Sequence, residues 1–310
     1  MKYPSFFEPK NSLNLFGLED NLQFLLSVYN KKNFPKVLML TGNKGSGKST
    51  LINHFLYSIF DQTNYEINTY TSDKSPFHQQ YTDGIFSNII YINGSDFSSV
   101  KIEDIRYLKT KILQSPILNK DRFIVLDDVE QFNVNSLNAL LKIIEEPGKD
   151  NCFILINNKS KPLLETIKSR SLEIKIILRE DQRLEIINEL INFYKIELSL
   201  DSNISQLSPG NFIKFNYLCN EYNISLENDF ITNLSLLLSL YKKSKDNHFI
   251  DLAFFVADIY IKDLLDKNIY KKDRIYEIKN FILDNLNKFL LYNINQNAFI
   301  SLVTNKLNNE

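Results

Sequence analysis

Short, wholly apolar runs alternate with helical patterns over roughly the first 180 residues of the chain. Continuous apolar strands that are separated by helices are typical of a parallel sheet covered by helices on both faces. We therefore predict an α/β fold for this part of the chain. The predicted strands are residues 37–40, 89–92, 123–126, 153–156 and 172–178.

The C-terminal part of the chain carries a different pattern. Pro209 and Gly210 are the last proline and glycine, and the hundred residues that follow contain neither. Because both residues are costly inside helices, their absence favours long helices. Apolar positions repeat there at helical spacing in two stripes, which we interpret as core packing. The stripes are Leu252, Phe255, Val256 and Ile259, then Ile275, Ile278, Ile282, Leu286, Phe289 and Leu290.

Between about 61 and 88 the chain is polar, rich in Asn, Tyr and Thr, and shows no hydrophobic period. A segment of this length without periodicity is typical of an insertion or a mobile loop. We predict such an insertion or mobile loop between the first predicted helix and the second predicted strand.

Composition excludes several classes of protein. Apolar residues make up 44% and charged residues 24%, which is ordinary for a globular protein, and the net charge of −1 gives no global attraction to nucleic acid or anionic membrane. The two cysteines, Cys152 and Cys219, are far apart and form no CxxC, so we expect neither a disulfide framework nor a zinc site. The chain contains no signal-peptide core and no run of about 18 apolar residues. We therefore expect no membrane association and a cytoplasmic location.

The first predicted strand runs into a glycine-rich loop and then into a helical pattern that extends to Phe60. Residues 42–49 fit GxxxxGK[ST], whose glycines let the backbone wrap phosphates while N–H groups and a helix N-terminus face the negative charge. Lys48 is expected to reach the β- and γ-phosphates and Ser49 to hold Mg²⁺, so the sequence predicts a Walker A nucleotide site. The predicted nucleotide-binding residues are Gly42, Asn43, Lys44, Gly45, Ser46, Gly47, Lys48, Ser49 and Thr50.

Two carboxylates, Asp127 and Asp128, follow the third predicted strand. A carboxylate at the end of an apolar strand beside a P-loop is the expected partner for Mg²⁺, and we assign this role to Asp127 together with Ser49. Asp128 stands where a carboxylate could orient an attacking water. Because Asp also favours turn positions, an equal alternative is that Asp128 caps the following turn.

The segment from Asp127 to Pro147 resembles the clamp-loader branch of the AAA+ ATPases. An acidic pair is followed by Asn-Ala-Leu-Leu-Lys at 138–142 and by Glu-Glu-Pro at 145–147, in the order of the family's pattern. Asn158, at the end of the next predicted strand, is similar to the family's sensor 1. Ser169-Arg170-Ser171 resembles its SRC motif, with Ser171 in place of Cys. Shorter matches at 16–18, 92–96 and 102–106 bring the resemblance to roughly 15–215.

In this family the SRC arginine acts in trans, so the resemblance implies that Arg170 points at the γ-phosphate bound by a neighbouring subunit. A guanidinium suits this role because it is always charged and forks onto phosphate oxygens. The resemblance further implies a ring- or spiral-forming ATPase that loads a sliding clamp onto primed DNA. Its implied cofactors are ATP and Mg²⁺. Its implied partners are the other loader subunits (gamma/tau and delta), the DNA polymerase III holoenzyme, the sliding clamp and primer-template DNA.

Three departures from the sequence pattern of the family's motor subunits indicate which type of subunit the chain resembles. The four zinc-binding cysteines of those subunits are absent from 61–88, so we expect no zinc. Asp128 replaces the catalytic glutamate and sets the carboxylate back by roughly 1 Å, a displacement that can cost about 100-fold in rate. No arginine stands at the sensor 2 position in 207–214, where Ser208-Pro209-Gly210 resembles the delta-prime type, a non-motor end subunit of the bacterial DNA polymerase III loader. We therefore predict a subunit of this type that binds ATP and has weak or no ATPase activity.

The resemblance also divides the chain into a P-loop domain at 1–178, a small helical lid at 179–225 and an all-α collar for oligomerisation at 226–310. Three alternatives remain at this point. The chain could be an active motor ATPase of the gamma/tau type, or a scaffold whose P-loop is vestigial. An unrelated P-loop kinase or transport ATPase is a third alternative, but it has no use for Arg170 or for the pattern at 138–147.

Overall fold

The structure, a computed structural model, describes residues 3–94, 100, 102–114, 116, 118, 120–201, 207–267 and 270–308. These residues fall into two compact units. The sheet unit contains 3–190 and 208–211, and the helical unit contains 191–207 and 212–310. Helices α7 (Glu180–Tyr194) and α8 (Pro209–Tyr222) each contribute residues to both units. The three-part division at 178 and 225 stays a prediction.

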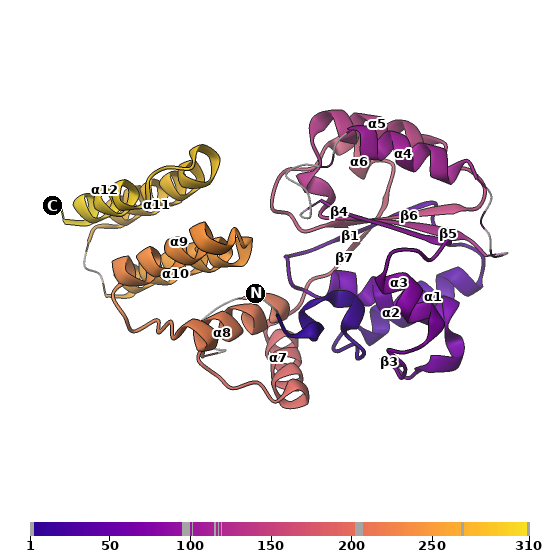
Figure 1. Cartoon of the computed structure of the whole chain (residues 1–310), viewed down its shortest axis with the longest axis horizontal. Coiled ribbons are helices and arrows are strands. Elements are labelled where there is room, and N and C mark those ends of the chain that lie inside the picture. The colour runs from indigo at the N-terminus through magenta and orange to yellow at the C-terminus, as the bar shows by residue number, and fades with distance from the viewer. Residues whose placement is uncertain are drawn as a thin grey trace. The chain divides into compact units, whose positions relative to one another are not determined.

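Five parallel strands form the centre of the sheet unit (Figure 1). Their order in the sheet is β4-β5-β6-β1-β7. All five predicted apolar runs are strands, which confirms the predicted α/β fold with a parallel sheet. The last run is shorter than predicted, because β7 ends at Lys175 and Leu178 lies outside it. The strands are β1 (Val37–Thr41), β4 (Ile89–Asn93), β5 (Arg122–Asp127), β6 (Asn151–Asn157) and β7 (Leu172–Lys175).

Helices cover both faces of this sheet, with α1, α2 and α3 on one side and α4, α5 and α6 on the other (Figure 1). Alternate side chains of a strand point to opposite faces, so Leu38 and Leu40 join one core while Val37 and Met39 join the other. Burial on both faces explains why the strands are continuously apolar. The helices are α1 (Glu19–Asn30), α2 (Lys48–Phe60), α3 (Pro76–Thr82), α4 (Ile102–Ile112), α5 (Val134–Glu145) and α6 (Glu165–Lys168).

The segment 61–88 is folded, so the predicted mobile loop is wrong as a description of this region, while the alternative of an insertion stays a prediction. It contains the hairpin of β2 (Tyr65–Glu66) and β3 (Thr69–Tyr70), and then α3. Tyr70 and Tyr81 are buried against Tyr57 of α2, with the Tyr57 and Tyr70 rings stacked at 4.4 Å. Each element is too short to show a hydrophobic period, which is why the pattern failed here.

Short 3-10 helices complete the sheet unit. Two lie near its N-terminus, where the Tyr57 hydroxyl donates a hydrogen bond to the Lys10 carbonyl. His54 of α2 bonds the Tyr65 hydroxyl (2.9 Å) and the Ser12 carbonyl (2.9 Å). The N-terminal segment is therefore fixed to α2 by buried polar contacts. The 3-10 helices are η1 (Ser5–Phe7), η2 (Pro9–Asn11), η3 (Gln62–Asn64) and η4 (Val129–Gln131).

Long helices make up the C-terminal part of the helical unit, as the absence of proline and glycine after Gly210 predicted. Of the predicted stripes, Phe255, Ile259 and Leu290 are partly exposed and the other positions are buried. Aspartates cap two of these helices, since Asp229 accepts a hydrogen bond from the Thr232 N–H and Asp246 from the His248 N–H. The four helices are α9 (Phe230–Ser244), α10 (Asn247–Asp266), α11 (Lys272–Tyr292) and α12 (Gln296–Asn308).

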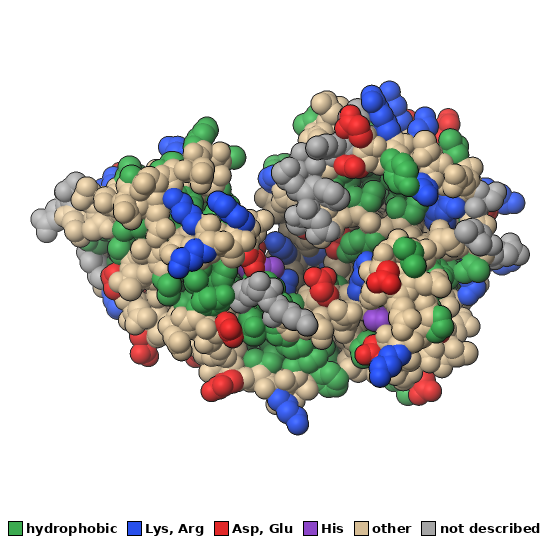
Figure 2. Space-filling model, in the orientation of Figure 1, with side chains coloured by type: hydrophobic (Ala, Val, Ile, Leu, Met, Phe, Trp, Pro, Cys, Tyr) green, Lys and Arg blue, Asp and Glu red, His purple; other side chains and the backbone are tan. Residues whose placement is uncertain are grey.

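The surface carries mixed charge. Acidic and basic side chains are interspersed over the visible face of the molecule (Figure 2), in keeping with the net charge of −1. Of the helices in the described part of the chain, none combines the length and the apolar character that a membrane span requires. Among the described residues, no three His, Cys, Asp or Glu side chains gather as ligands for a metal ion.

Candidate nucleotide site

The predicted P-loop lies at the carboxyl edge of the sheet, between β1 and α2. Gly45 and Gly47 adopt positive φ angles of 80° and 86°, a backbone conformation that L side chains rarely adopt. Gly47 is the N-terminal cap residue of α2, so the first N–H groups of that helix open towards the loop. Asn43 and Lys44 are exposed in the loop, and Thr50 lies in the first turn of α2. The local sequence thus forms the backbone cradle that a phosphate requires.

Lys48 is folded back over the loop and is only 3% exposed. Its Nζ donates hydrogen bonds to the carbonyls of Gly42 (2.9 Å) and Asn43 (2.7 Å), and it lies 3.3 Å from the Ser46 hydroxyl. Burial lowers the pKa of Lys48 to about 8, while the nearby carboxylates, Asp127 foremost, act in the opposite direction. A phosphate in the cradle would add further negative charge beside this ammonium group.

Asp127 and Ser49, the predicted Mg²⁺ ligands, lie in direct contact. The Ser49 hydroxyl donates to Asp127 Oδ2 at 2.6 Å, and the Tyr91 hydroxyl donates to the same oxygen at 2.6 Å. The Asp128 N–H donates to Asp127 Oδ1 at 2.9 Å. Burial raises the pKa of Asp127, and the hydrogen bonds from Ser49 and Tyr91 oppose this rise. A cation at this position would replace the two hydroxyl hydrogens as the partner of the carboxylate.

Asp128 faces the predicted sensor 1 residue. It adopts a left-handed backbone conformation (φ 51°), and its Oδ1 accepts a hydrogen bond from Asn158 Nδ2 at 2.5 Å. The turn after it is closed by backbone, since the Gln131 N–H donates to the Asp128 carbonyl. The side chain therefore points to Asn158, and this orientation favours the water-orienting position over the turn cap.

Glu130 fixes the strand end that carries Asn158. It is 3% exposed, and its carboxylate accepts hydrogen bonds from the Asn158 N–H (3.1 Å) and from the Ser160 hydroxyl (2.7 Å). The side chain of Asn157 instead accepts from the Lys159 N–H (2.9 Å). Of the two neighbouring asparagines, Asn158 is thus the one whose side chain reaches the acidic pair.

The start of α8 lies directly on the P-loop within the sheet unit. The Ser208 hydroxyl donates to the Lys44 carbonyl at 2.5 Å, and the Gly210 N–H donates to the Gly45 carbonyl at 2.8 Å. A Cβ at Gly210 would stand only 2.9 Å from the Gly45 oxygen. The sequence stretch that lacks the sensor 2 arginine therefore contacts the loop through the Ser208 hydroxyl and the Gly210 N–H.

Arg170 lies away from these residues, after α6 and beside the end of α5. Its Nη2 is 2.8 Å from Glu145 Oε1, and its side chain is 38% exposed. The sequence predicted this residue as part of a site, but the structure does not bring it into the nucleotide site of its own chain. The hydrogen bonds of Arg170 go to Glu145, Thr166 and Ser169 and to no residue of the P-loop, which is compatible with a role in trans.

The residues present fit a nucleotide with Mg²⁺. Gly45 and Gly47 add no side chain of their own to the cradle, and Lys48 supplies the cation beside it. Ser49 and Asp127 place a hydroxyl and a carboxylate oxygen 2.6 Å apart, which is the hard-oxygen donor set that Mg²⁺ prefers. When bound, Mg²⁺ would neutralise phosphate charge, and these side chains would orient it.

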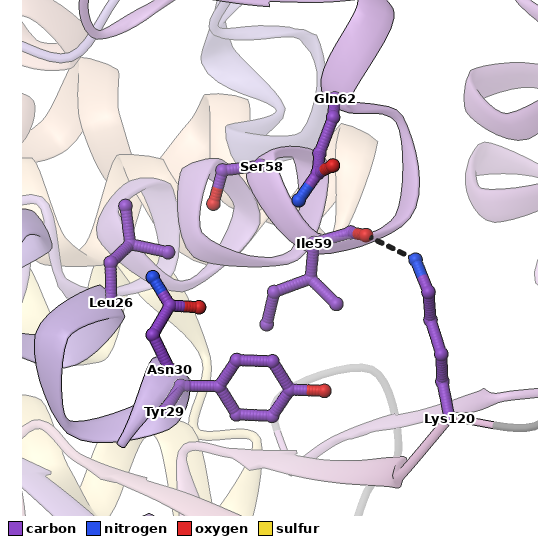
Figure 3. Close-up of a pocket in the computed structure, with 7 residues that line it drawn as sticks. All are labelled: Leu26, Tyr29, Asn30, Ser58, Ile59, Gln62 and Lys120. Atoms are coloured by element: carbon purple, nitrogen blue, oxygen red, sulfur yellow. Dashed lines mark hydrogen bonds between the residues drawn. The ribbon is translucent and has the colours of Figure 1, made fainter. Parts of the chain in front are cut away.

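A cavity of about 210 Å³ lies elsewhere in the sheet unit (Figure 3). Tyr29 of α1 and the C-terminal end of α2 line it, and Lys120 closes it by donating to the Ile59 carbonyl at 2.6 Å. The P-loop is at the opposite end of α2, roughly 20 Å away for a 13-residue helix. The cavity is therefore separate from the nucleotide site, and Lys120 serves as a cap for the last carbonyls of α2.

The sequence pattern did not single out Tyr91 and Glu130. Tyr91 was hidden in the apolar run of β4, where a tyrosine is an ordinary strand residue. Glu130 was the detectable signal, since it is a charged residue between the apolar Val129 and Phe132 directly after the acidic pair. Of the shorter matches, residues 95 and 96 lie outside the described part of the chain.

Comparison with known protein families gives a match over more than half of the chain. The family model described as "DNA polymerase III, delta subunit" matches residues 17–179. These residues contain the P-loop, the acidic pair, Asn158 and Arg170.

Curated relatives are subunits of the same polymerase. The DNA polymerase III subunit gamma of Buchnera aphidicola subsp. Schizaphis graminum is 28% identical over 187 residues, which cover 60% of this chain and 49% of that protein. The DNA polymerase III subunit delta' of Pseudomonas aeruginosa is 36% identical over 74 residues, which cover 24% of this chain and 23% of that protein. The chain thus matches about half the length of the first relative and about a quarter of the second.

Among solved structures, a DNA polymerase III gamma subunit-related protein from Thermotoga maritima is 16% identical, with a TM-score of 0.49. The similarity covers 91% of this chain and 96% of that chain.

Proposed function

Because this chain belongs to the clamp-loader family of DNA polymerase III subunits, we propose that it acts as the delta-prime type of subunit. On this proposal it binds ATP with Mg²⁺ in its own P-loop but turns it over weakly or not at all. Its catalytic contribution is Arg170, which it offers to the nucleotide of a neighbouring motor subunit. The subunit thereby helps load a sliding clamp onto primed DNA.

The P-loop supports the binding half of this proposal. The cradle, Lys48 and the Ser49–Asp127 pair supply the parts that hold phosphates and Mg²⁺. The role of Lys48 is to neutralise phosphate charge. The role of Asp127 is to position Mg²⁺, either as a direct ligand or by holding the Ser49 hydroxyl that binds it.

The contact between α8 and the P-loop carries the proposal of weak turnover. In phosphoryl transfer, positive groups around the γ-phosphate stabilise the charge of the transition state. Here the stretch 207–214, which offers no sensor 2 arginine, contacts the loop through the Gly210 N–H and the Ser208 hydroxyl. Asp128, shorter than glutamate, is also drawn to Asn158. We therefore expect this site to orient the attacking water and to stabilise the transition-state charge less well than a motor subunit does, while its phosphate-binding residues are retained.

The proposed partners follow from the family. They are the gamma/tau and delta subunits, the DNA polymerase III holoenzyme and, through the assembled loader, the sliding clamp and primer-template DNA. We assign the joining of subunits to the collar helices of 226–310, with 179–225 as the lid, and place the assembly in the cytoplasm. The exposed Arg170, with no part in its own nucleotide site, supports an action across a subunit boundary.

Two measurements test the two halves of the proposal separately. Isothermal titration of the purified chain with ATP and Mg²⁺ should give binding that Lys48→Ala abolishes. Lys31→Ala, which removes an exposed lysine outside the P-loop, is the control and should bind. Absence of binding by the unmodified chain would favour the vestigial P-loop and refute the binding half.

The trans role of Arg170 is tested in the reconstituted loader. Arg170→Ala should lower ATP hydrolysis by the assembly, because removal of such an arginine costs about 10³–10⁵ in rate at the site it serves. Arg179→Ala, which removes another exposed arginine, is the control. Hydrolysis that is unchanged by Arg170→Ala would contradict the proposed role.

The intact P-loop favours one second candidate, an active motor subunit of the gamma/tau type. All the residues expected to bind nucleotide and Mg²⁺ are in place in this chain. The two candidates differ in turnover by the purified chain alone. Steady hydrolysis that Lys48→Ala abolishes would support the motor subunit against the delta-prime type.

A further inference from the structure

Every nitrogen of the Arg170 side chain is engaged within its own chain. Nε donates to Glu145 Oε1 at 2.9 Å, and Nη2 lies 2.8 Å from the same oxygen. Nη1 donates to the Thr166 carbonyl at 3.0 Å and lies 3.5 Å from the Ser169 hydroxyl. The guanidinium is therefore held at the junction of α5 and α6, which lie side by side on the same face of the sheet (Figure 1).

This arrangement conflicts with a contact to phosphate. A guanidinium binds phosphate oxygens through the same N–H edge that it uses for a carboxylate, and the two acceptors compete for it. Because Glu145 Oε1 takes both Nε and Nη2, that edge is occupied as long as the pair persists. The carboxylate also neutralises the charge that makes the arginine useful near a γ-phosphate.

We propose that Glu145 is a positioning residue that holds Arg170 in a parked state, from which the nucleotide of the neighbouring subunit must draw it. This inference rests on the proposed trans role of Arg170. In the hydrolysing form of the assembled loader, the γ-phosphate of the neighbouring nucleotide would have to replace the Glu145 carboxylate as the partner of Arg170. Glu145 thus suppresses hydrolysis in loaders in which the neighbouring site is not closed against this chain.

The ion pair of Arg170 and Glu145 is weak enough to restrain Arg170 reversibly. Arg170 and Glu145 are 38% and 46% exposed, and solvent screens an ion pair in such a position. Exposed pairs of this kind change an equilibrium by about twofold to fivefold. A pair of that strength is weak enough for a doubly charged phosphate to displace and strong enough to alter hydrolysis measurably.

The test uses the reconstituted loader without clamp and DNA. Glu145→Gln keeps the size of the side chain and removes its charge, and we expect it to raise basal ATP hydrolysis about twofold to fivefold. Glu146→Gln is the matched control, because Glu146 is the exposed neighbour and forms no ion pair with any residue that the structure describes. We expect it to leave hydrolysis unchanged. The double variant Glu145→Gln/Arg170→Ala should hydrolyse ATP at the rate of Arg170→Ala alone.

A plain structural role of the pair would give different results. It would lower the unfolding midpoint of Glu145→Gln without raising hydrolysis. Equal or lower hydrolysis in Glu145→Gln than in Glu146→Gln, with Arg170→Ala impaired, overturns the parked state and leaves the trans role of Arg170 standing. Unimpaired hydrolysis in Arg170→Ala overturns the trans role and the parked state together.

A second measurement examines the pair without the other subunits. In ¹⁵N spectra of the full chain, the Arg170 Nε–H should exchange with water more slowly in the unmodified protein than in Glu145→Gln. Equal exchange rates in the two proteins would show that the pair does not hold Arg170 in solution and would overturn the proposal.

Discussion

Substitution of Gly45 by alanine probes the contact between α8 and the P-loop, on which the proposed weak turnover depends. Two separate effects are expected at this position. The backbone has a φ angle of 80°, which costs an L residue about 1–2 kcal/mol. The new Cβ would also stand 2.5 Å from the Ser208 hydroxyl and 2.8 Å from the Asn211 nitrogen, closer than atoms can approach.

Gly84 separates these two effects. Its φ angle is 70°, and a Cβ there would meet nothing within 4 Å, so Gly84→Ala carries the backbone strain alone. Gly45→Ala adds overpacking against the start of α8, which typically costs a further 1–3 kcal/mol or so. We therefore expect a loss of about 1–2 kcal/mol in the free energy of unfolding for Gly84→Ala and about 2–5 kcal/mol for Gly45→Ala.

The assay is urea unfolding of the nucleotide-free protein, followed by far-ultraviolet circular dichroism because the chain has no tryptophan. Nucleotide is left out so that loss of binding does not enter the comparison. Ser208→Gly removes the nearest atom and should restore part of the stability of Gly45→Ala. Equal losses for Gly45→Ala and Gly84→Ala, within about 0.5 kcal/mol, would refute the close contact between α8 and the loop.

Two further expectations follow from the same unit. Asp128→Glu should raise ATP turnover by the purified chain about tenfold to 100-fold, because it restores roughly 1 Å of reach to the carboxylate. The measurement is phosphate release. An unchanged rate would instead attribute the weak turnover to the contact of α8 with the P-loop. Burial lowers the pKa of His54 to about 4 from 6.5, so as pH falls below 6.5 the unfolded chain takes a proton that the folded chain does not. The free energy of unfolding should then fall by up to about 1.4 kcal/mol per pH unit between pH 6.5 and 4, an added slope that His54→Gln should lack.

The strands were predictable because their sequence reflects a single physical constraint. Both faces of the sheet are covered, so Ile124 and Val125 must both be apolar although they point in opposite directions. The segment 61–88 obeys no such constraint. Its buried side chains, Tyr70 and Tyr81 among them, come from a two-residue strand and a seven-residue helix, which are too short for a period to show.

The parts of the candidate site also differ in how far the sequence alone could predict them. The P-loop could be predicted because its residues are contiguous and each glycine has a conformational reason. The pair of Asp128 and Asn158 joins residues 30 positions apart, and it depends on the left-handed backbone at Asp128 and on β5 and β6 being neighbours. The pair of Arg170 and Glu145 depends on how α5 and α6 pack. Sequence pattern records periodicity and local turns, but it does not record such distant contacts.

On the proposed function, binding and hydrolysis of nucleotide depend on different residues of this site, so one can be retained while the other is weakened. Affinity for ATP and Mg²⁺ would come mainly from the backbone cradle, Lys48 and the Ser49–Asp127 pair, which would hold the β- and γ-phosphates in ground state and transition state alike. Rate depends on groups that act only in the transition state, namely a carboxylate at the attacking water and cations at the γ-phosphate. The chain departs from the motor pattern at Asp128 and by the absence of an arginine from 207–214, and both departures concern the second set. On the proposed function, the chain's own site lacks the sensor 2 cation, while Arg170 supplies a different cation to the neighbouring site once it leaves Glu145.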